Sequence, residues 1–143
     1  MTGAGAARDG GVEVLLHRRF DEASLRDTRH DVRRQLISAG LNEDRADDFT
    51  FAINEGLINA IMHGGGSGDL ALARTGRRLI ASVEDRRPTT PFALPTQLPP
   101  PPALGGRGLW LVSRSCDAVH LESGRHGLRL VMEIELPARV GAD

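Results

Sequence analysis

Three polar side chains follow one another at four-residue spacing in an otherwise apolar segment near the middle of the chain. They are Glu55, Asn59 and His63, and the surrounding apolar residues recur with the 3.6-residue period of a helix. Side chains four residues apart on a helix point the same way, so an acid–base group lies beside an oxygen ligand. Because Mg²⁺ prefers oxygen donors, the pair suits a site for a Mg²⁺-bound nucleotide. The alternative is the solvated edge of an amphipathic helix.

A carboxylate further along the chain is a second candidate for binding. Leu79, Ala81 and Val83 alternate toward one face of a predicted strand, and the same alternation places Asp85 on that inward face. A carboxylate there accepts a hydrogen bond from an exocyclic amine while its apolar neighbours hold a flat ring. The simpler interpretation is a turn-forming aspartate at the end of a strand.

A glycine-rich turn is the third candidate. Gly105, Gly106 and Gly108 precede a predicted helix that runs from Leu109 to about residue 116. The backbone N–H groups and the positive dipole at a helix start attract anions, and glycine lets a phosphate approach the backbone. Arg107 adds a guanidinium suited to phosphate oxygens. Alternatively, the glycines simply end the preceding loop.

The helices and strands that must position these candidates can be predicted from the sequence. Strands and helices are expected in the order β-α-α-β-β-lid-α-β-β, with Asp21 or Ser24 capping the first helix, Gly40 ending it and Asn42 capping the second. The expected strands are 12–18, 69–74, 79–85, 118–122 and 128–136, and the central helix ends at residue 63. The glycine-rich residues 64–68 are expected to break regular structure. This order predicts an α+β fold, a two-layer sandwich with about three helices on one face of a mixed, largely antiparallel sheet.

Composition restricts the function classes. A chain of 143 residues with net charge −1 suits one domain and disfavours a protein that binds nucleic acid by neutralising phosphates. All 18 basic residues are arginine, so a phosphate-loop lysine and Schiff-base chemistry are excluded. The single cysteine, Cys116, allows no intrachain disulfide and is expected to be packed. No stretch is apolar enough to span a membrane or to act as a signal peptide, which favours a cytoplasmic protein.

Proline content marks the boundaries of the expected domain. Seven of the eight prolines lie between Pro88 and Pro102, so residues 86–105 are expected to form a lid or binding loop. Residues 1–11 are Gly- and Ala-rich and are expected to be a disordered tail, and 138–143 a C-terminal tail. A single domain is therefore expected over residues 12–137.

Taken together, these motifs resemble a known family. The run from Glu55 through Asn59 to His63 and Gly64 resembles the N-box of the gyrase, chaperone, histidine-kinase and mismatch-repair ATPase superfamily. Its NA-x-x-HG ending is typical of the bacterial anti-sigma-factor serine kinases. The run GGRGLWLV at residues 105–112 resembles the second glycine box of that subgroup. The resemblance covers about residues 12–137 and implies the Bergerat ATP-binding fold, with ATP and Mg²⁺ as cofactors.

The resemblance also implies roles for single residues. Glu55 would act as general base, Asn59 would coordinate Mg²⁺, and Asp85 would recognise adenine. Residues of the second glycine box would hold the phosphates and the cofactor, namely Gly106, Arg107, Gly108 and Leu109. The implied activity is a protein serine/threonine kinase that phosphorylates an antagonist protein and sequesters a sigma factor. A homodimer is possible within the family, and no direct contact with nucleic acid or membrane is expected.

One position departs from the family pattern. The first glycine box usually reads D-x-G, whereas Asp85 is followed here by Arg86, Arg87 and Pro88. Arg87 thus stands beside the base in place of the glycine, as a residue of the cofactor site. This departure favours an alternative, a non-catalytic protein-interaction switch of the same fold with weak or lost ATP binding.

Overall fold

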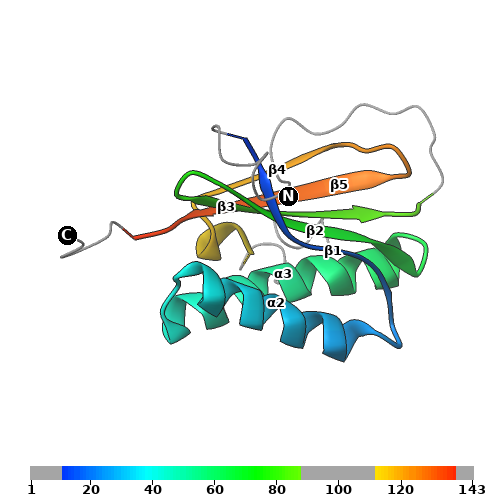
Figure 1. Cartoon of the computed structure of the whole chain (residues 1–143). Coiled ribbons are helices and arrows are strands. Elements are labelled where there is room, and N and C mark those ends of the chain that lie inside the picture. Colours follow the sequence, from blue (N-terminus) through cyan, green and yellow to red (C-terminus); the bar gives the residue numbers. More distant parts are fainter. Residues whose placement is uncertain (1–10, 88–111, 138–143) are drawn as a thin grey trace, which may run out of the picture.

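The structure is a computed structural model that describes residues 11–87 and 112–137. Two helices and five strands follow one another along these residues (Figure 1). They are β1 (Glu13–Asp21), α2 (Leu25–Ala39), α3 (Glu43–His63), β2 (Ser67–Thr75), β3 (Arg78–Asp85), β4 (Ala118–Ser123) and β5 (Leu128–Glu135). Residues 112–115 form a further short helical turn. The predictions of two tails and a lid fall largely or wholly on residues 1–10, 88–111 and 138–143, outside the described residues.

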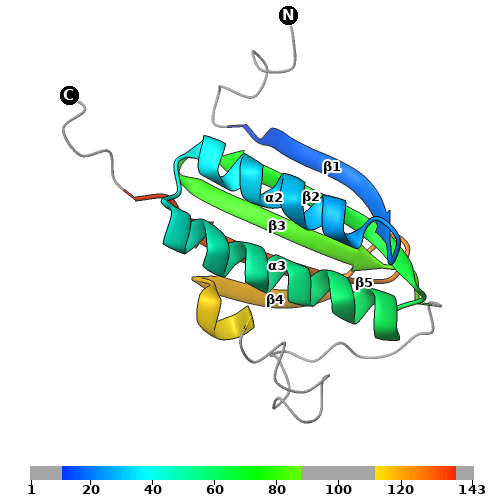
Figure 2. The same cartoon turned by 90° about the horizontal axis from the view of Figure 1, so that it is seen from below.

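The strands form one five-stranded sheet in the order β1-β2-β3-β5-β4. Every pairing between these strands is antiparallel, so the described sheet contains no parallel pair. Both long helices lie on the same face of the sheet, and the short helical turn lies on that side as well (Figures 1 and 2). The predicted α+β two-layer architecture is therefore confirmed. No helix within the described ranges is long and apolar enough to cross a membrane.

Gly40 and Asn42 end and cap the two long helices as predicted, whereas the predicted cap at the start of the first helix differs. Gly40 ends α2 with a left-handed φ of 117°, a conformation that glycine adopts without steric cost. The Asn42 side chain caps α3 by accepting a hydrogen bond from the backbone N–H of Arg45 at 2.8 Å. Ser24 stands at the N-cap of α2, but its side chain makes no capping bond. Its hydroxyl instead accepts from the backbone N–H of Asp21 at 3.0 Å, so the two predicted caps bond each other.

The core lies between the helices and the sheet because each element presents one apolar face. On α3, Phe49, Ile53 and Leu57 are fully buried, as the helical period predicts. They belong to the same core as equally buried residues of the sheet, including Leu70, Leu72, Leu79, Met132 and Ile134. Helix α3 contacts β2, β3 and β5, whereas α2 lies over β1 and against α3. The helix that carries Glu55 and Asn59 is thus fixed across the middle of the sheet.

The glycine-rich connection after α3 is shorter than predicted. Strand β2 already begins at Ser67, so the prediction that residues 64–68 break regular structure is wrong for the last two. Gly68 pairs with Asp85 in the ladder between β2 and β3. The carbonyl of Gly64 accepts a hydrogen bond from the backbone N–H of Arg86 at 2.8 Å. The end of α3 is therefore tied to the end of β3, where the predicted binding carboxylate lies.

Candidate functional site

The Asp85 carboxylate lies at the end of β3, on the face of the sheet that the helices cover. Leu79, Ala81 and Val83 precede it on the same face and are buried, as the alternation predicts. Asp85 itself is only 4% exposed. A carboxylate so far from water needs hydrogen-bond donors, because burial of an unpaired polar group is costly. Its surroundings therefore define what this end of the sheet can bind.

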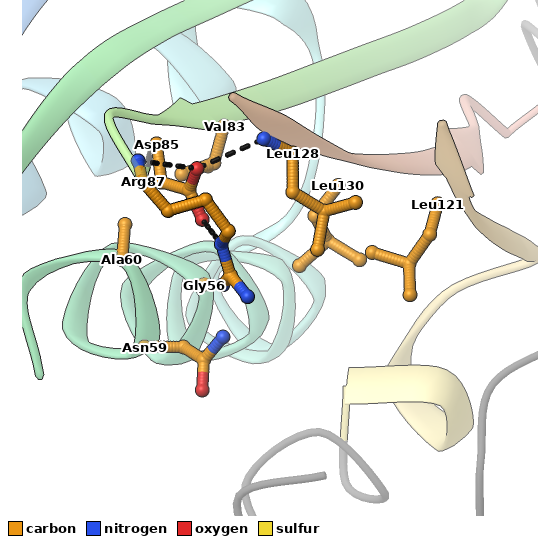
Figure 3. A pocket seen from close by; sticks show the side chains of 9 residues that line it. All are labelled: Gly56, Asn59, Ala60, Val83, Asp85, Arg87, Leu121, Leu128 and Leu130. Carbon is orange, nitrogen blue, oxygen red and sulfur yellow. Dashed lines mark hydrogen bonds and ion pairs between the residues drawn. The ribbon is translucent and has the colours of Figure 1, made fainter. Parts of the chain in front are cut away.

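Three N–H groups donate to this carboxylate (Figure 3). The backbone N–H of Leu128 donates to Oδ1 at 2.9 Å, and the backbone N–H of Arg87 donates to the same oxygen at 3.2 Å. The guanidinium Nε of Arg87 donates to Oδ2 at 2.7 Å, which makes the pair an ion pair as well. Asp85 is thus held from two sides, by its own strand end and by the start of β5.

Two glycines allow the chain to close around Asp85. A Cβ at Gly64 would lie 2.5 Å from the Asp85 Oδ2 and Cβ atoms. A Cβ at Gly127 would overlap Oδ1 and the carbonyl oxygen of the same residue. Neither glycine has a positive φ, so the requirement is space and not backbone conformation. The sequence marks Gly64 as part of the Glu55–Gly64 motif and of the glycine-rich connection, and neither pattern anticipates its contact with Asp85.

A cavity opens beside Asp85, between α3 and the sheet. Its free volume is about 30 Å³, room for about two waters. The apolar lining comes from α3 and three strands, with Asn59, Asp85 and Arg87 as its polar members (Figure 3). The remaining lining residues are Gly56, Ala60, Val83, Leu121, Leu128 and Leu130. A carboxylate among apolar walls suits a flat ring that carries an amine.

The structure brings together some of the predicted site residues and leaves others unassigned. Asn59 of α3 lines the same cavity as Asp85, at the end of β3, and Arg87, two residues further along. Glu55 lies one helical turn before Asn59 and is half-buried, but it is not among the residues that line the cavity. The predicted phosphate-holding residues 106–109 lie outside the described residues, so their roles stay predictions.

Several lining residues were missed by the reading of the sequence. Leu121 and Leu130 face the cavity from β4 and β5, and their apolar alternation was the available signal. The N–H of Leu128 carried no signal, because any residue at that position offers a backbone donor. Gly56 lies on the apolar face of α3, and a Cβ there would lie 3.2 Å from a methyl carbon of Leu130, so glycine lets the helix pack closely on the sheet beside the cavity.

A second polar cluster lies on the opposite side of the same strand end. The Glu84 carboxylate accepts from the backbone N–H of His126 and, at 3.2 Å, from the guanidinium of Arg129. Arg129 also donates to Glu122 at 2.9 Å. Burial acts to raise the pKa of Glu84, but these donors outweigh it and hold the pKa below its ordinary value. This cluster joins β3, β4 and β5 without lining the cavity.

The side chains near the cavity suit Mg²⁺ only if waters and phosphates supply most of its ligands. Within residues 11–87 and 112–137 there is no group of three or more His, Cys, Asp and Glu side chains able to hold a metal. A metal held entirely by such side chains is therefore not provided by the described residues. Mg²⁺ usually takes one or two protein oxygens and completes its shell with waters and phosphates. The amide oxygen of Asn59 fits that mode of binding.

The comparisons with known proteins agree with this arrangement. A family model described as the histidine kinase-like ATPase domain matches residues 19–134. The solved structure of the RsbU and RsbW domains of Rv1364c from Mycobacterium tuberculosis is similar, with a TM-score of 0.62 and 24% sequence identity. The match covers 87% of this chain and 33% of the other, so this chain spans about a third of that protein's length. Among curated proteins, none matches the chain significantly. The family match extends over most of the chain, which therefore belongs to the histidine kinase-like ATPase domain family.

Proposed function

We propose that the protein binds Mg·ATP at the cavity beside Asp85. The observation that carries the proposal is a buried carboxylate fixed at an apolar cavity, with the Asn59 amide on the same cavity. Asp85 would accept a hydrogen bond from the adenine amine while Val83 and Leu130 cover the ring. Asn59 would supply an oxygen to the metal. Gly106, Arg107, Gly108 and Leu109 would hold the phosphates, as the resemblance implies.

The proposed reaction is the transfer of the γ-phosphate to a serine or threonine hydroxyl of a protein antagonist. When bound, Mg²⁺ offsets the charge that develops on the phosphates. Glu55 takes the proton of the attacking hydroxyl, and its place on α3, one turn from Asn59, supports this role. The NA-x-x-HG ending supports an anti-sigma factor that sequesters a sigma factor until the antagonist competes for it. The proposed setting is the cytoplasm, and homodimer formation remains part of the proposal.

Calorimetric titration with Mg·ATP tests the binding step. The parent is expected to bind in the micromolar range or more weakly, and Asn59→Ala is expected to weaken binding in the presence of Mg²⁺. Asn54→Ala is a matched control, because Asn54 is also an asparagine of α3 but lines a different hollow, beside α2. Equal losses in the two variants would argue against Asn59 as a ligand.

Phosphoryl transfer to a candidate antagonist tests the chemical step. Glu55→Gln keeps the size and polarity of the side chain, so nucleotide affinity should change by no more than a few-fold. The transfer rate should fall by roughly 10²–10⁴, the usual contribution of a positioned general base. Glu43→Gln, in the exposed first turn of the same helix, should leave the rate unchanged. Equal rates for the parent and Glu55→Gln would exclude the catalytic role.

A second candidate function has a specific observation in its favour. The guanidinium of Arg87 already bonds the carboxylate proposed to recognise adenine. A non-catalytic protein-interaction switch of the same fold would show this feature, with weak or lost nucleotide binding. Absence of Mg·ATP binding by the parent, with retained binding of a sigma factor, would favour this second candidate.

A further inference from the structure

We infer that Arg87 is an intramolecular competitor for the nucleotide site, bonded to the carboxylate that the base must reach. The inference rests on the proposed function, since it concerns the same cavity. It assigns Arg87 a role that neither the fold nor the family match contains.

The hydrogen-bond acceptors of Asp85 are largely occupied. A carboxylate offers about four lone-pair sites, and three N–H groups already donate to this one. Two of these donors are the backbone N–H and Nε of Arg87. The third, the N–H of Leu128, belongs to β5 and is fixed by the sheet. Oδ1 accepts two of the three donors and Oδ2 accepts the guanidinium, so an incoming amine must share Oδ2 with Arg87 or displace it.

The space beside Asp85 is also largely filled. In Figure 3 the Arg87 side chain extends from Asp85 toward α3, and its guanidinium lies between Asp85 and Asn59. The free volume of about 30 Å³ that remains is far below the several hundred Å³ of ordinary ligand sites. A purine ring and the Arg87 guanidinium thus require the same space. Binding of a nucleotide demands that the guanidinium leave.

Replacing the Arg87 guanidinium with the amine of a base as the donor to Asp85 is energetically unfavourable. The Arg87 side chain is 31% exposed, whereas that of Asp85 is only 5% exposed, so the carboxylate depends on its partners more than the guanidinium does. Displacing Arg87 replaces a charged donor with the neutral amine of a base. Charge-assisted hydrogen bonds are roughly twice as strong as neutral ones. The nucleotide must therefore recover this difference from its other contacts, and its apparent affinity falls.

The neighbouring arginine provides a matched control. The guanidinium of Arg86 pairs with Asp69 at 2.6 Å and does not line the cavity. Arg86→Gly and Arg87→Gly thus make the same chemical change at adjacent positions, with the same effect on net charge. Only Arg87→Gly removes the competitor. The comparison separates the proposed competition from a general loss of positive charge.

Two ligands, adenosine and Mg·ATP, test the inference by calorimetry on the full chain. Adenosine has no phosphates, so its affinity reports the base side alone. Arg87→Gly is expected to bind both ligands about tenfold more tightly than the parent, because one partner of a partly buried charge pair is gone. Arg86→Gly should stay within about threefold of the parent. If Arg87→Gly weakens Mg·ATP and leaves adenosine unchanged, Arg87 is a phosphate ligand and the inference is wrong.

A measurement without nucleotide keeps the inference testable if affinities are low. A double-mutant cycle of Arg87→Gly and Asp85→Asn, read by urea unfolding, should show a coupling between the two side chains. No coupling would show that the ion pair does not form, which overturns the inference. Equal binding of adenosine by the parent and Arg87→Gly would overturn it while leaving the proposed function intact. If Arg87→Gly binds the ligands and the parent does not, the result supports the inference and counts against ATP binding by the parent.

Discussion

Replacing Gly64 with alanine tests whether the buried Asp85 carboxylate is held by close packing. Gly64 has a φ of −119°, which any residue adopts, so alanine brings no backbone strain there. Its Cβ, however, would lie 2.5 Å from Asp85 Oδ2 and 2.7 Å from Asp85 Cγ. The backbone at Gly64 cannot easily withdraw, because its N–H donates to Ala60 and its carbonyl accepts from Arg86, each at 2.8 Å.

The expected loss of stability follows from two opposing terms. Overpacking of a close contact costs about 1–3 kcal/mol. Alanine also restricts the unfolded chain, which returns about 0.4–1 kcal/mol. The net destabilisation by Gly64→Ala should therefore be about 1–2 kcal/mol. For a domain of this size the melting temperature should fall by roughly 4–8 °C.

A double-mutant cycle with Asp85→Gly identifies the cause of that loss. Asp85→Gly removes the atoms that the new Cβ meets, so it should relieve the clash and couple to Gly64→Ala by about 1–3 kcal/mol. Gly66 is the control, since its φ is 89° and nothing lies within 4 Å of a Cβ there. Gly66→Ala should also destabilise, by about 1–2 kcal/mol of backbone strain, but without coupling to Asp85→Gly. Equal coupling at both glycines, or an unchanged melting temperature in Gly64→Ala, would refute the reasoning.

Three further perturbations test other parts of the structure. The pKa of Glu84 is below its ordinary 4.5, so its contribution to stability is present above that pH and is lost as the pH falls through the lowered pKa. Urea unfolding at pH 6 and pH 3 should show a smaller loss in Glu84→Gln than in the parent, and equal losses would contradict this. Burial, with a smaller effect of Asp117, raises the pKa of the Cys116 thiol to about 12, so a thiol reagent should react slowly with folded protein and rapidly in urea. Similar rates in the two states would show that the thiol is not protected. Asn42→Ala should cost about 1 kcal/mol through loss of the α3 cap, whereas Asn42→Asp should retain most of the stability, as thermal unfolding can measure.

The fold was largely predictable because its signals are local. The apolar stripe through Phe49, Ile53 and Leu57 sets the buried face of α3, and Gly40 and Asn42 mark helix ends through chemistry confined to a few residues. The inward position of Asp85 follows from strand alternation alone. Periodicity and capping depend on the nearest neighbours in the chain, which the sequence contains directly.

The site was predictable only in part, because its contacts join residues far apart in the sequence. The alternation predicts that Asp85 is buried but not that Leu128 donates to it, since that bond depends on the register of β5. The departure at Arg87 was visible, whereas its ion pair with Asp85 required the positions of both side chains. The need for glycine at Gly64 and Gly127 likewise arises from tertiary packing, not from turn geometry.

The strand order has a consequence for how the chain assembles during synthesis. Strand β5 lies between β3 and β4, although it follows both in the chain. Until a ribosome has released β5, one edge of β3 has no partner and β4 has no neighbour in the sheet. An unpaired edge is prone to pair with another chain, so the nascent protein has a period of vulnerability to aggregation. The same late arrival of β5 brings the N–H of Leu128 to Asp85, so the buried carboxylate lacks this donor until β5 has joined the sheet.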